Sequence, residues 1–162
     1  MATSSSSSSS KNIWYIDFEG YHFDNKFIVK EIAIVKKDSL QCYNYFVMNP
    51  CNIPHAPNTQ TIHFQYKRHN LRWEFGDFKF CDVIEDIISK VKSSDAVYGK
   101  GAAKVAFLKK WLPQIQEMTW INTPFKKLYN CISEVCEIRH GFNCARRKAH
   151  ELQYIDCMYN IK

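Results

Sequence analysis

Three strand-like stretches follow one another near the start of the chain, and this feature constrains the fold most. Residues 12–18 are rich in β-branched and aromatic side chains, as expected of a strand in the centre of a sheet, and Gly20 is predicted to end it. Residues 27–36 and 40–48 follow as two further strands, with residues 37–39 as a hairpin turn between them. The sequence therefore predicts an antiparallel meander.

The rest of the chain alternates helix-like and strand-like segments. Residues 82–91 and 102–112 repeat apolar side chains at helical spacing, and residues 145–158 form a predicted last helix. Short strands are predicted at residues 96–98 and 118–121. A meander followed by such alternation predicts the α/β class, with a mixed sheet and flanking helices.

The composition predicts one folded domain behind a flexible tail. With 162 residues and 46% hydrophobic content, the chain can bury one sizeable core but is too short for two ordinary domains. Serine dominates the start of the chain and cannot bury apolar surface. We therefore expect a disordered tail over residues 1–11 and a single domain over residues 12–162.

Charge and cysteine content narrow the classes of partner and compartment. The formal net charge of +6 permits contact with phosphate but is far from a histone-like excess. The first ten residues lack the basic start and apolar stretch of a secretory leader, and no apolar run is long enough to span a membrane, so we expect no membrane partner. The seven cysteines then favour buried thiols or metal ligands in a reducing compartment, cytoplasmic or nuclear.

Two carboxylates near the end of the first predicted strand are candidate catalytic residues. Asp17 and Glu19 alternate with Phe18, so they point to the same side of the strand and can share one divalent cation. Hydrolysis by two metal ions needs several such carboxylates on neighbouring elements. One pair is weak support by itself, because carboxylates at a strand end also simply face water. Its cofactor would be Mg²⁺ or Mn²⁺.

The setting of this pair resembles the DEDDh exonucleases, a family with an RNase H-like fold. Residues 16–20, followed by residues 30–35, are similar to the opening of those enzymes. Residues 97–108 resemble their second segment, which carries an Asp, and residues 143–149 resemble their last, which carries a His and an Asp. The resemblance implies an RNase H-like, exonuclease-type mixed sheet with flanking helices.

The sequence departs from these enzymes at the residues that matter for catalysis. Lys104 stands at the position of the second-segment Asp, Asn143 at that of the His, and Lys148 at that of the last Asp. These changes remove metal ligands and the general base, and they place positive charge where cations should bind. Exonuclease activity is therefore predicted to be lost. An alternative register uses His150 and Asp156, although their spacing is six residues instead of five.

A cluster of thiol and imidazole side chains precedes the last helix. Cys131, Cys136, His140 and Cys144 lie at intervals that suit zinc in a reducing compartment. The alternative is a set of small buried hydrophobic residues beside an exposed His, because cysteine often serves that purpose. The cluster alone leaves both interpretations open.

A second resemblance bears on this cluster. Residues 31–35 lead through residues 43–46 to the proline-containing residues 49–54, and a Cys and a His precede the pair at 144–145 that opens the last helix. This order is similar to the Maelstrom domain, an RNase H-like domain of animal small-RNA silencing that has a Glu-Cys-His-Cys zinc site in place of its catalytic set. The resemblance implies the following zinc ligands, with Cys131 in reserve: Glu31, Cys136, His140 and Cys144.

The predicted function follows from this resemblance. Four protein ligands leave no open position for water, so the zinc would be structural. The resemblance places a group of basic side chains near the ancestral nucleic-acid face, which favours a nucleic-acid-binding module, RNA more than DNA, in small-RNA silencing. The predicted nucleic-acid-binding residues are Lys100, Lys104, Arg146, Arg147 and Lys148.

Two other functions stay open. The first is a residual nuclease that uses Asp17 and Glu19, or the single-strand RNA cleavage that has been associated with the Maelstrom family. The second is an adaptor that binds proteins, because the aromatic content would equally serve an interface. An aromatic stripe interleaved with Arg72 and Lys79 could stack bases or cover a sheet edge. The stripe consists of Trp73, Phe75, Phe78 and Phe80.

Overall fold

A mixed sheet forms the centre of the molecule. The structure is a computed structural model, and it describes residues 11–39, 41–51, 57–119 and 144–159. Within these residues five strands pair in the order β3-β2-β1-β4-β5. The first three form the predicted antiparallel meander, and β4 and β5 run parallel to β1. The strands are β1 (Ile13–Phe23), β2 (Lys26–Lys36), β3 (Cys42–Phe46), β4 (Ala96–Gly99) and β5 (Ile115–Glu117).

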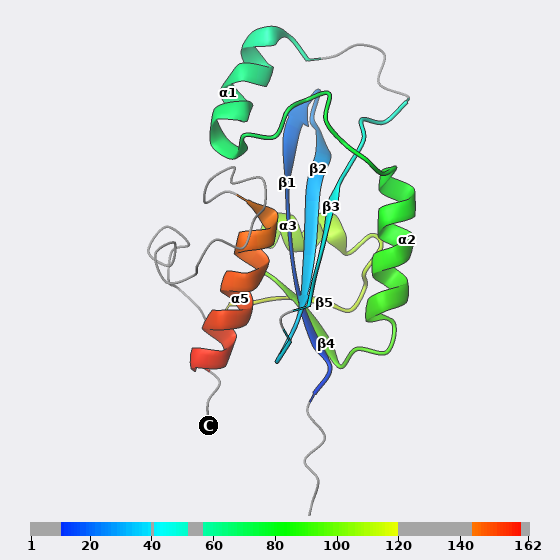
Figure 1. The fold of residues 1–162 in the computed structure, drawn as a ribbon, viewed down its shortest axis with the longest axis vertical. Helices are drawn as coiled ribbons and strands as arrows, with labels where there is room; N and C mark the ends of the chain where they lie inside the picture. Colours follow the sequence, from blue (N-terminus) through cyan, green and yellow to red (C-terminus); the bar gives the residue numbers. More distant parts are fainter. Residues whose placement is uncertain (1–10, 40, 52–56, 120–143, 160–162) are drawn as a thin grey trace, which may run out of the picture.

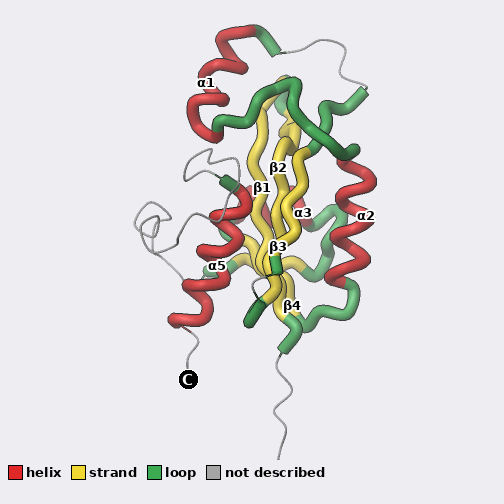
Figure 2. The backbone as a smooth tube through the Cα atoms, viewed as in Figure 1, coloured by secondary structure: helices red, strands yellow, loops and turns green. Residues whose placement is uncertain are grey.

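Helices cover both faces of this sheet, as Figures 1 and 2 show. The first face packs against α2 (Phe80–Val91) and α3 (Ala102–Leu108), and the other packs against α5 (Ala145–Tyr159). A further helix, α1 (Thr59–His69), lies beyond the end of the sheet where the β1–β2 hairpin turns. The α/β class with a mixed sheet and flanking helices is thus confirmed. Among the described residues, no helix combines the length and the apolar character that crossing a membrane requires.

The side chains of β1 alternate between the two faces, as a pleated strand requires. Trp14, Ile16 and Phe18 join the cluster that includes the apolar face of α2. Tyr15 packs with Leu152 of α5 on the opposite face. In β2, Ile32 and Ile34 likewise join the α2 cluster, whereas Ala33 and Val35 pack against Ala145 and Ala149 of α5. We call these surfaces the α2 face and the α5 face.

Gly20 does not end the first strand, contrary to the prediction. The strand continues to Phe23, and its pairing with β2 shifts register between Glu19 and Gly20. A Cβ atom at Gly20 would lie 2.0 Å from the carbonyl oxygen of Ile28, so only glycine allows this close approach of the two strands. The glycine is therefore the site of a strand irregularity, and its lack of a side chain keeps the hairpin intact.

Two other boundaries differ from the prediction. The helix predicted over residues 102–112 ends at Leu108, and residues 109–111 form turns in which the Trp111 and Leu112 N–H groups both bond to the Leu108 carbonyl ahead of Pro113. The strand predicted over residues 118–121 lies instead at Ile115–Glu117, where Ile115 supplies the buried side chain. Residues 120 and 121 lie outside the described residues. The last predicted helix is confirmed, and its predicted inward residues, Ala145, Ala149, Leu152 and Ile155, are buried.

The helix α1 was not predicted from the sequence. Asn58 caps it, because its side chain accepts a 2.8 Å hydrogen bond from the Thr61 N–H, and Asn70 ends it in the left-handed conformation. Of its residues only His69 is fully buried, so no continuous apolar stripe marks it. The two caps were the signal in the sequence that could have revealed it.

Candidate functional site

Three carboxylates form a row on the α5 face. Asp17 and Glu19 come from β1, and Glu31 lies directly opposite Glu19 on β2. Asp17 is 2% exposed and Glu31 is fully buried. Facing carboxylates repel each other when both are charged, so the row requires compensating positive charge. The residues belong to two separate sites as predicted from the sequence, but they lie side by side in the structure.

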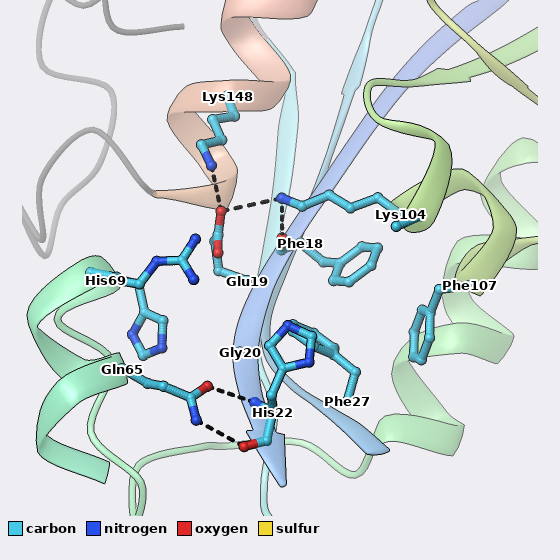
Figure 3. A pocket seen from close by; sticks show the side chains of 12 residues that line it. Phe18, Glu19, Gly20, His22, Phe27, Gln65, His69, Lys104, Phe107 and Lys148 are labelled. Atoms are coloured by element: carbon cyan, nitrogen blue, oxygen red, sulfur yellow. Dashed lines mark hydrogen bonds and ion pairs between the residues drawn. The ribbon is translucent and has the colours of Figure 1, made fainter. Parts of the chain in front are cut away.

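Lys104 supplies part of that charge, from the first turn of α3 (Figure 3). Its Nζ atom lies 2.8 Å from Asp17 Oδ1, 2.7 Å from the Phe18 carbonyl oxygen and 3.2 Å from Glu19 Oε1. An ammonium group has three N–H donors, so these three acceptors use all of them. The Lys104 ammonium thus occupies the space between the two candidate catalytic carboxylates.

Lys148 supplies a second ammonium group, from the first turns of α5. Its Nζ atom donates to Glu19 Oε1 at 2.5 Å, so one carboxylate oxygen accepts from both lysines. Both predicted replacements of metal-ligating aspartates therefore lie against the residual carboxylates (Figure 3). A divalent cation bound to Asp17 and Glu19 would have to displace these ammonium groups or bear their repulsion.

The charges of the cluster depend on one another. Burial alone would raise the pKa of Glu19, but Lys104 and Lys148 outweigh it and hold the pKa below its ordinary value. For Asp17, burial prevails over the same two lysines, and its pKa is raised. Burial would lower the pKa of Lys104, but Asp17 and Glu19 raise it instead. Lys104 is therefore a stable cation at neutral pH.

Lys100 and Arg147, two of the other predicted nucleic-acid-binding residues, lie near the same cluster through Glu151, whereas Arg146 lies near His150. Arg147 and Lys148 are each 8% exposed, whereas Arg146 and Lys100 are partly exposed. Burial lowers the pKa of Lys100, and the charge of Glu151 opposes that shift. The structure thus gathers basic side chains from α3, α5 and the end of β4 near the carboxylate row.

Glu31 and Cys144 are the two predicted zinc ligands that fall within the described residues. Both are fully buried, and Cys144 Sγ lies 3.5 Å from Glu31 Oε1. The other Glu31 oxygen accepts a 3.0 Å hydrogen bond from the Ala145 N–H, so the carboxylate also binds the amino end of α5. Cys131, Cys136 and His140 lie outside the described residues.

The pair fits what a structural zinc needs. A tetrahedral zinc about 2.0 Å from a carboxylate oxygen and about 2.3 Å from a thiolate holds these atoms roughly 3.5 Å apart. The observed separation of 3.5 Å matches that requirement, although it equally suits a thiol hydrogen bond. Within the described ranges, no three His, Cys, Asp or Glu side chains converge on a common metal position. A complete ligand set would thus need residues outside those ranges.

The alternative catalytic pair is engaged elsewhere on α5. His150 contacts Gln153 at 3.4 Å, and Asp156 accepts a hydrogen bond from the Tyr15 hydroxyl. Lys37 also lies 4.0 Å from Asp156. These contacts lie further along α5 than the contact of Lys148 with Glu19.

Glu151 is a member of the cluster that the sequence analysis missed. It lies on α5 one turn beyond Lys148 and is fully buried, and within the described part of the chain neither of its carboxylate oxygens has a hydrogen-bond partner. Burial raises its pKa to about 7, with a further contribution from Asp17, although Arg147 and Lys148 oppose the shift. Its position on the inward stripe of the last helix was the signal that could have revealed it.

A cavity of about 320 Å³ opens beside the carboxylate–lysine cluster. Glu19, Lys104 and Lys148 line one side of it, and the aromatic rings of Phe18, Phe27 and Phe107 line another. Its size is at the lower end of the range for small-ligand sites. We call it the lysine pocket.

The helix α1 closes this pocket with residues that the sequence analysis did not assign. Gln65 and Arg68 are lining residues, together with the buried His69. The Gln65 amide holds α1 to β1, because it accepts from the His22 N–H at 2.6 Å and donates to the His22 carbonyl at 2.8 Å. Arg68 adds a third basic side chain to a pocket in which Glu19 is the acidic lining residue.

The aromatic stripe lies mainly against the outer strand of the meander. Phe75 and Phe78 pack against Phe46 and Tyr45 of β3, with ring centroids 5.3 Å and 6.2 Å apart. Trp73 is buried against Tyr21 at 5.3 Å. Phe75 and Phe78 remain 41% and 50% exposed, so they cover the strand edge without being buried.

No family model matches the sequence, and no curated protein matches it significantly.

Proposed function

We propose that this chain is a nucleic-acid-binding domain, for RNA more than DNA, built on an RNase H-like, exonuclease-type fold that no longer cleaves by a two-metal mechanism. The single observation that carries the proposal is the Lys104 ammonium between Asp17 and Glu19, with all three of its donors bound to oxygens of β1. Protonated lysines thus take up the charge that catalytic cations would otherwise neutralise.

The order and direction of the strands support the fold assignment. In the order β3-β2-β1-β4-β5, β2 alone runs against its neighbours, and β1 lies in the centre. Asp17 and Glu19 lie on this central strand. Lys104 lies on α3, which follows β4, and Lys148 lies near the start of α5, the last helix. The four positions agree with the resemblance to DEDDh exonucleases, including its departures.

The lysine pocket supports binding of nucleic acid. Arg68 and Lys148 line it beside aromatic rings, while the three donors of the Lys104 ammonium are held by β1. Single-stranded nucleic acid is bound through phosphate contacts and base stacking. The preference for RNA and the link to small-RNA silencing rest on the resemblance to the Maelstrom domain.

Titration of a fluorescent single-stranded RNA with the full chain, over a series of salt concentrations, tests this proposal. We expect binding that weakens with salt and that Arg68→Ala reduces, because Arg68 is an exposed basic residue that lines the pocket. Lys92→Ala, which removes one exposed positive charge at the end of α2, is the matched control and should leave affinity unchanged. Absence of salt-dependent binding to RNA and to DNA of the same length would refute the proposal and favour the protein-binding adaptor.

We also propose a structural zinc that Glu31 and Cys144 would bind together with Cys136 and His140, with Cys131 in reserve. The buried Glu31–Cys144 contact supports it, since zinc there would hold the amino end of α5 to β2. Elemental analysis of the chain purified without added metal should find about one zinc per chain. Glu31→Gln and Cys144→Ser should lose it, whereas Cys81→Ser, at an exposed cysteine on α2, should retain it. A native protein without zinc would refute the site.

A further inference from the structure

A second hollow, of about 670 Å³, lies next to the lysine pocket. Its lining runs from the start of β2 to the first residue of α2 and the end of α3, and it includes Phe80, Lys110 and Trp111. His22, Phe27 and Phe107 line both this hollow and the lysine pocket. The two hollows are therefore adjacent, and an extended ligand that occupies both would cross His22, Phe27 and Phe107. We call the second hollow the aromatic groove.

The walls of the groove are aromatic. The rings of Phe80 and Trp111 lie 5.1 Å apart between centroids, those of Phe107 and Trp111 5.3 Å apart, and those of Phe27 and Phe107 5.8 Å apart. The rings are only partly buried, although they pack against the α2-face cluster. Partly exposed, well-supported rings are surfaces on which bases stack.

The charge of the groove has one sign. Lys26 and Lys110 are its charged lining residues, and no Asp or Glu of the described residues lines it. Both lysines are exposed, and Lys110 Nζ lies 5.8 Å from the centroid of the Phe107 ring and 6.0 Å from that of Trp111. A cation held beside aromatic rings complements a polymer that carries a phosphate next to each base.

We infer that the aromatic groove binds the continuation of a single RNA strand whose first nucleotides lie in the lysine pocket. This inference rests on the proposed function and adds the path of the strand across the surface. The path runs from the carboxylate–lysine cluster across Phe27 and Phe107 to Lys26 and Lys110. Bases stack on the groove rings, and the two lysines contact phosphates. The lysines beside aromatic rings favour this occupant over a peptide, because a nucleic-acid strand carries a phosphate next to each base along its whole length.

Oligouridines of about 4 and about 12 nucleotides test the inference, since a short strand fills only the lysine pocket. We expect the full chain to bind the longer strand more tightly. The double variant Lys26→Gln/Lys110→Gln should lose most of this gain from length. The slope of log K against log salt should also become less steep by about 1.4 in this variant. Each phosphate contact with a single strand releases about 0.7 counterions, and the variant removes two such contacts.

A matched variant and a ring variant complete the experiment. Lys11→Gln/Lys92→Gln makes the same change in net charge at exposed lysines outside both hollows and should leave the gain from length intact. Phe27→Leu keeps apolar volume but removes the shared ring, and it should weaken binding of the longer strand about 5-fold or more. Thermal melting of each variant verifies that the fold persists.

The outcomes separate the inference from the proposed function. Suppose that the native chain binds the longer strand more tightly, and that Lys26→Gln/Lys110→Gln shows the same gain in affinity with length and the same salt dependence. The groove is then not on the path of the strand, so the inference is overturned while RNA binding stands. If the native chain binds neither strand, the proposed function itself fails. Tight binding of both strands with equal affinity also overturns the inference.

Discussion

The two faces of the sheet bury different kinds of side chain. Under α2 the packed side chains are aliphatic and aromatic, and they extend from Trp14 to Ile115 in one cluster. Under α5 the apolar clusters are small, and Asp17, Glu31 and Glu151 are buried between and beside them. Apolar burial stabilises a fold without specifying chemistry, whereas buried charge is costly unless it is paired. The α2 face therefore accounts for stability, and the α5 face is where a function would be found.

Removal of apolar volume from the α2 face should have the largest effect on stability. Ile87 of α2 is fully buried, so Ile87→Ala should lower the free energy of unfolding by about 4 kcal/mol. The loss should be the same at neutral and mildly acidic pH, because the buried side chains of this cluster are aliphatic and aromatic and carry no carboxylate or imidazole. Denaturant unfolding at the two pH values measures it. A strongly pH-dependent loss would contradict the separation of the two faces.

Removal of a cation from the α5 face should have a comparable but pH-dependent effect. Lys104→Met leaves Asp17 and Glu19 without their shared ammonium group and should cost about 3 kcal/mol near pH 7. Because the pKa of Glu19 is lowered in the native protein, its contribution is present above its ordinary value of 4.5 and is lost as the pH falls through the native pKa. The difference between native protein and variant should therefore shrink in acid.

The comparison between these two variants is itself the control. A Lys104→Met loss that stayed constant from neutral to acidic pH would mean that the lysine contributes through packing of its side chain, and not through the carboxylates.

Glu151 offers a variant that should stabilise the protein. Its native pKa of about 7 lies above its ordinary value of 4.5, so the native state loses stability as the pH rises between these values. Glu151→Gln removes this penalty and should raise the free energy of unfolding by about 3 kcal/mol near pH 8, with no gain below pH 4. Denaturant unfolding against pH checks this, and a variant no more stable than the native protein at pH 8 would contradict it.

The smallest expected effect concerns α1, which belongs to neither face. Asn58→Ala removes the cap on the Thr61 N–H and should destabilise this helix by about 1 kcal/mol. Since α1 positions Gln65 and Arg68 in the lysine pocket, RNA affinity should fall while the cooperative unfolding of the sheet changes little. Binding and unfolding measured on the same preparation test this. Unfolding altered as strongly as by Ile87→Ala would show that α1 is part of the core.

The sequence predicted the apolar elements on both faces of the sheet well, for a physical reason. Long apolar repeats such as those of β1, β2, α2 and α5 arise from burial itself, so period and composition reveal them. Gly20 was misjudged because glycine ends strands and also permits irregularities within them, and only the approach of Ile28 decides between the two. The helix α1 was missed because it buries little apolar surface.

The candidate site could be predicted only in part. Asp17, Glu19, Glu31 and Cys144 were identified from motifs, and their spacing along the strand predicted that Asp17 and Glu19 share a side. That Glu19 lies opposite Glu31 depends on the register between β1 and β2, which no local pattern specifies. The contributions of Glu151 and Arg68 depend on the packing of α5 and α1, so they required the tertiary structure.

The central claim is that lysines on the α5 face have replaced catalytic cations, and a combined binding and cleavage assay tests it most directly. End-labelled single-stranded RNA is incubated with the full chain in Mg²⁺, in Mn²⁺ or in EDTA, and bound and shortened RNA are measured in the same samples. We predict RNA that is bound in all three conditions, most tightly in EDTA because divalent cations compete for the phosphates, and that remains intact throughout. Shortening that requires Mg²⁺ or Mn²⁺ and disappears in Asp17→Asn would contradict the account.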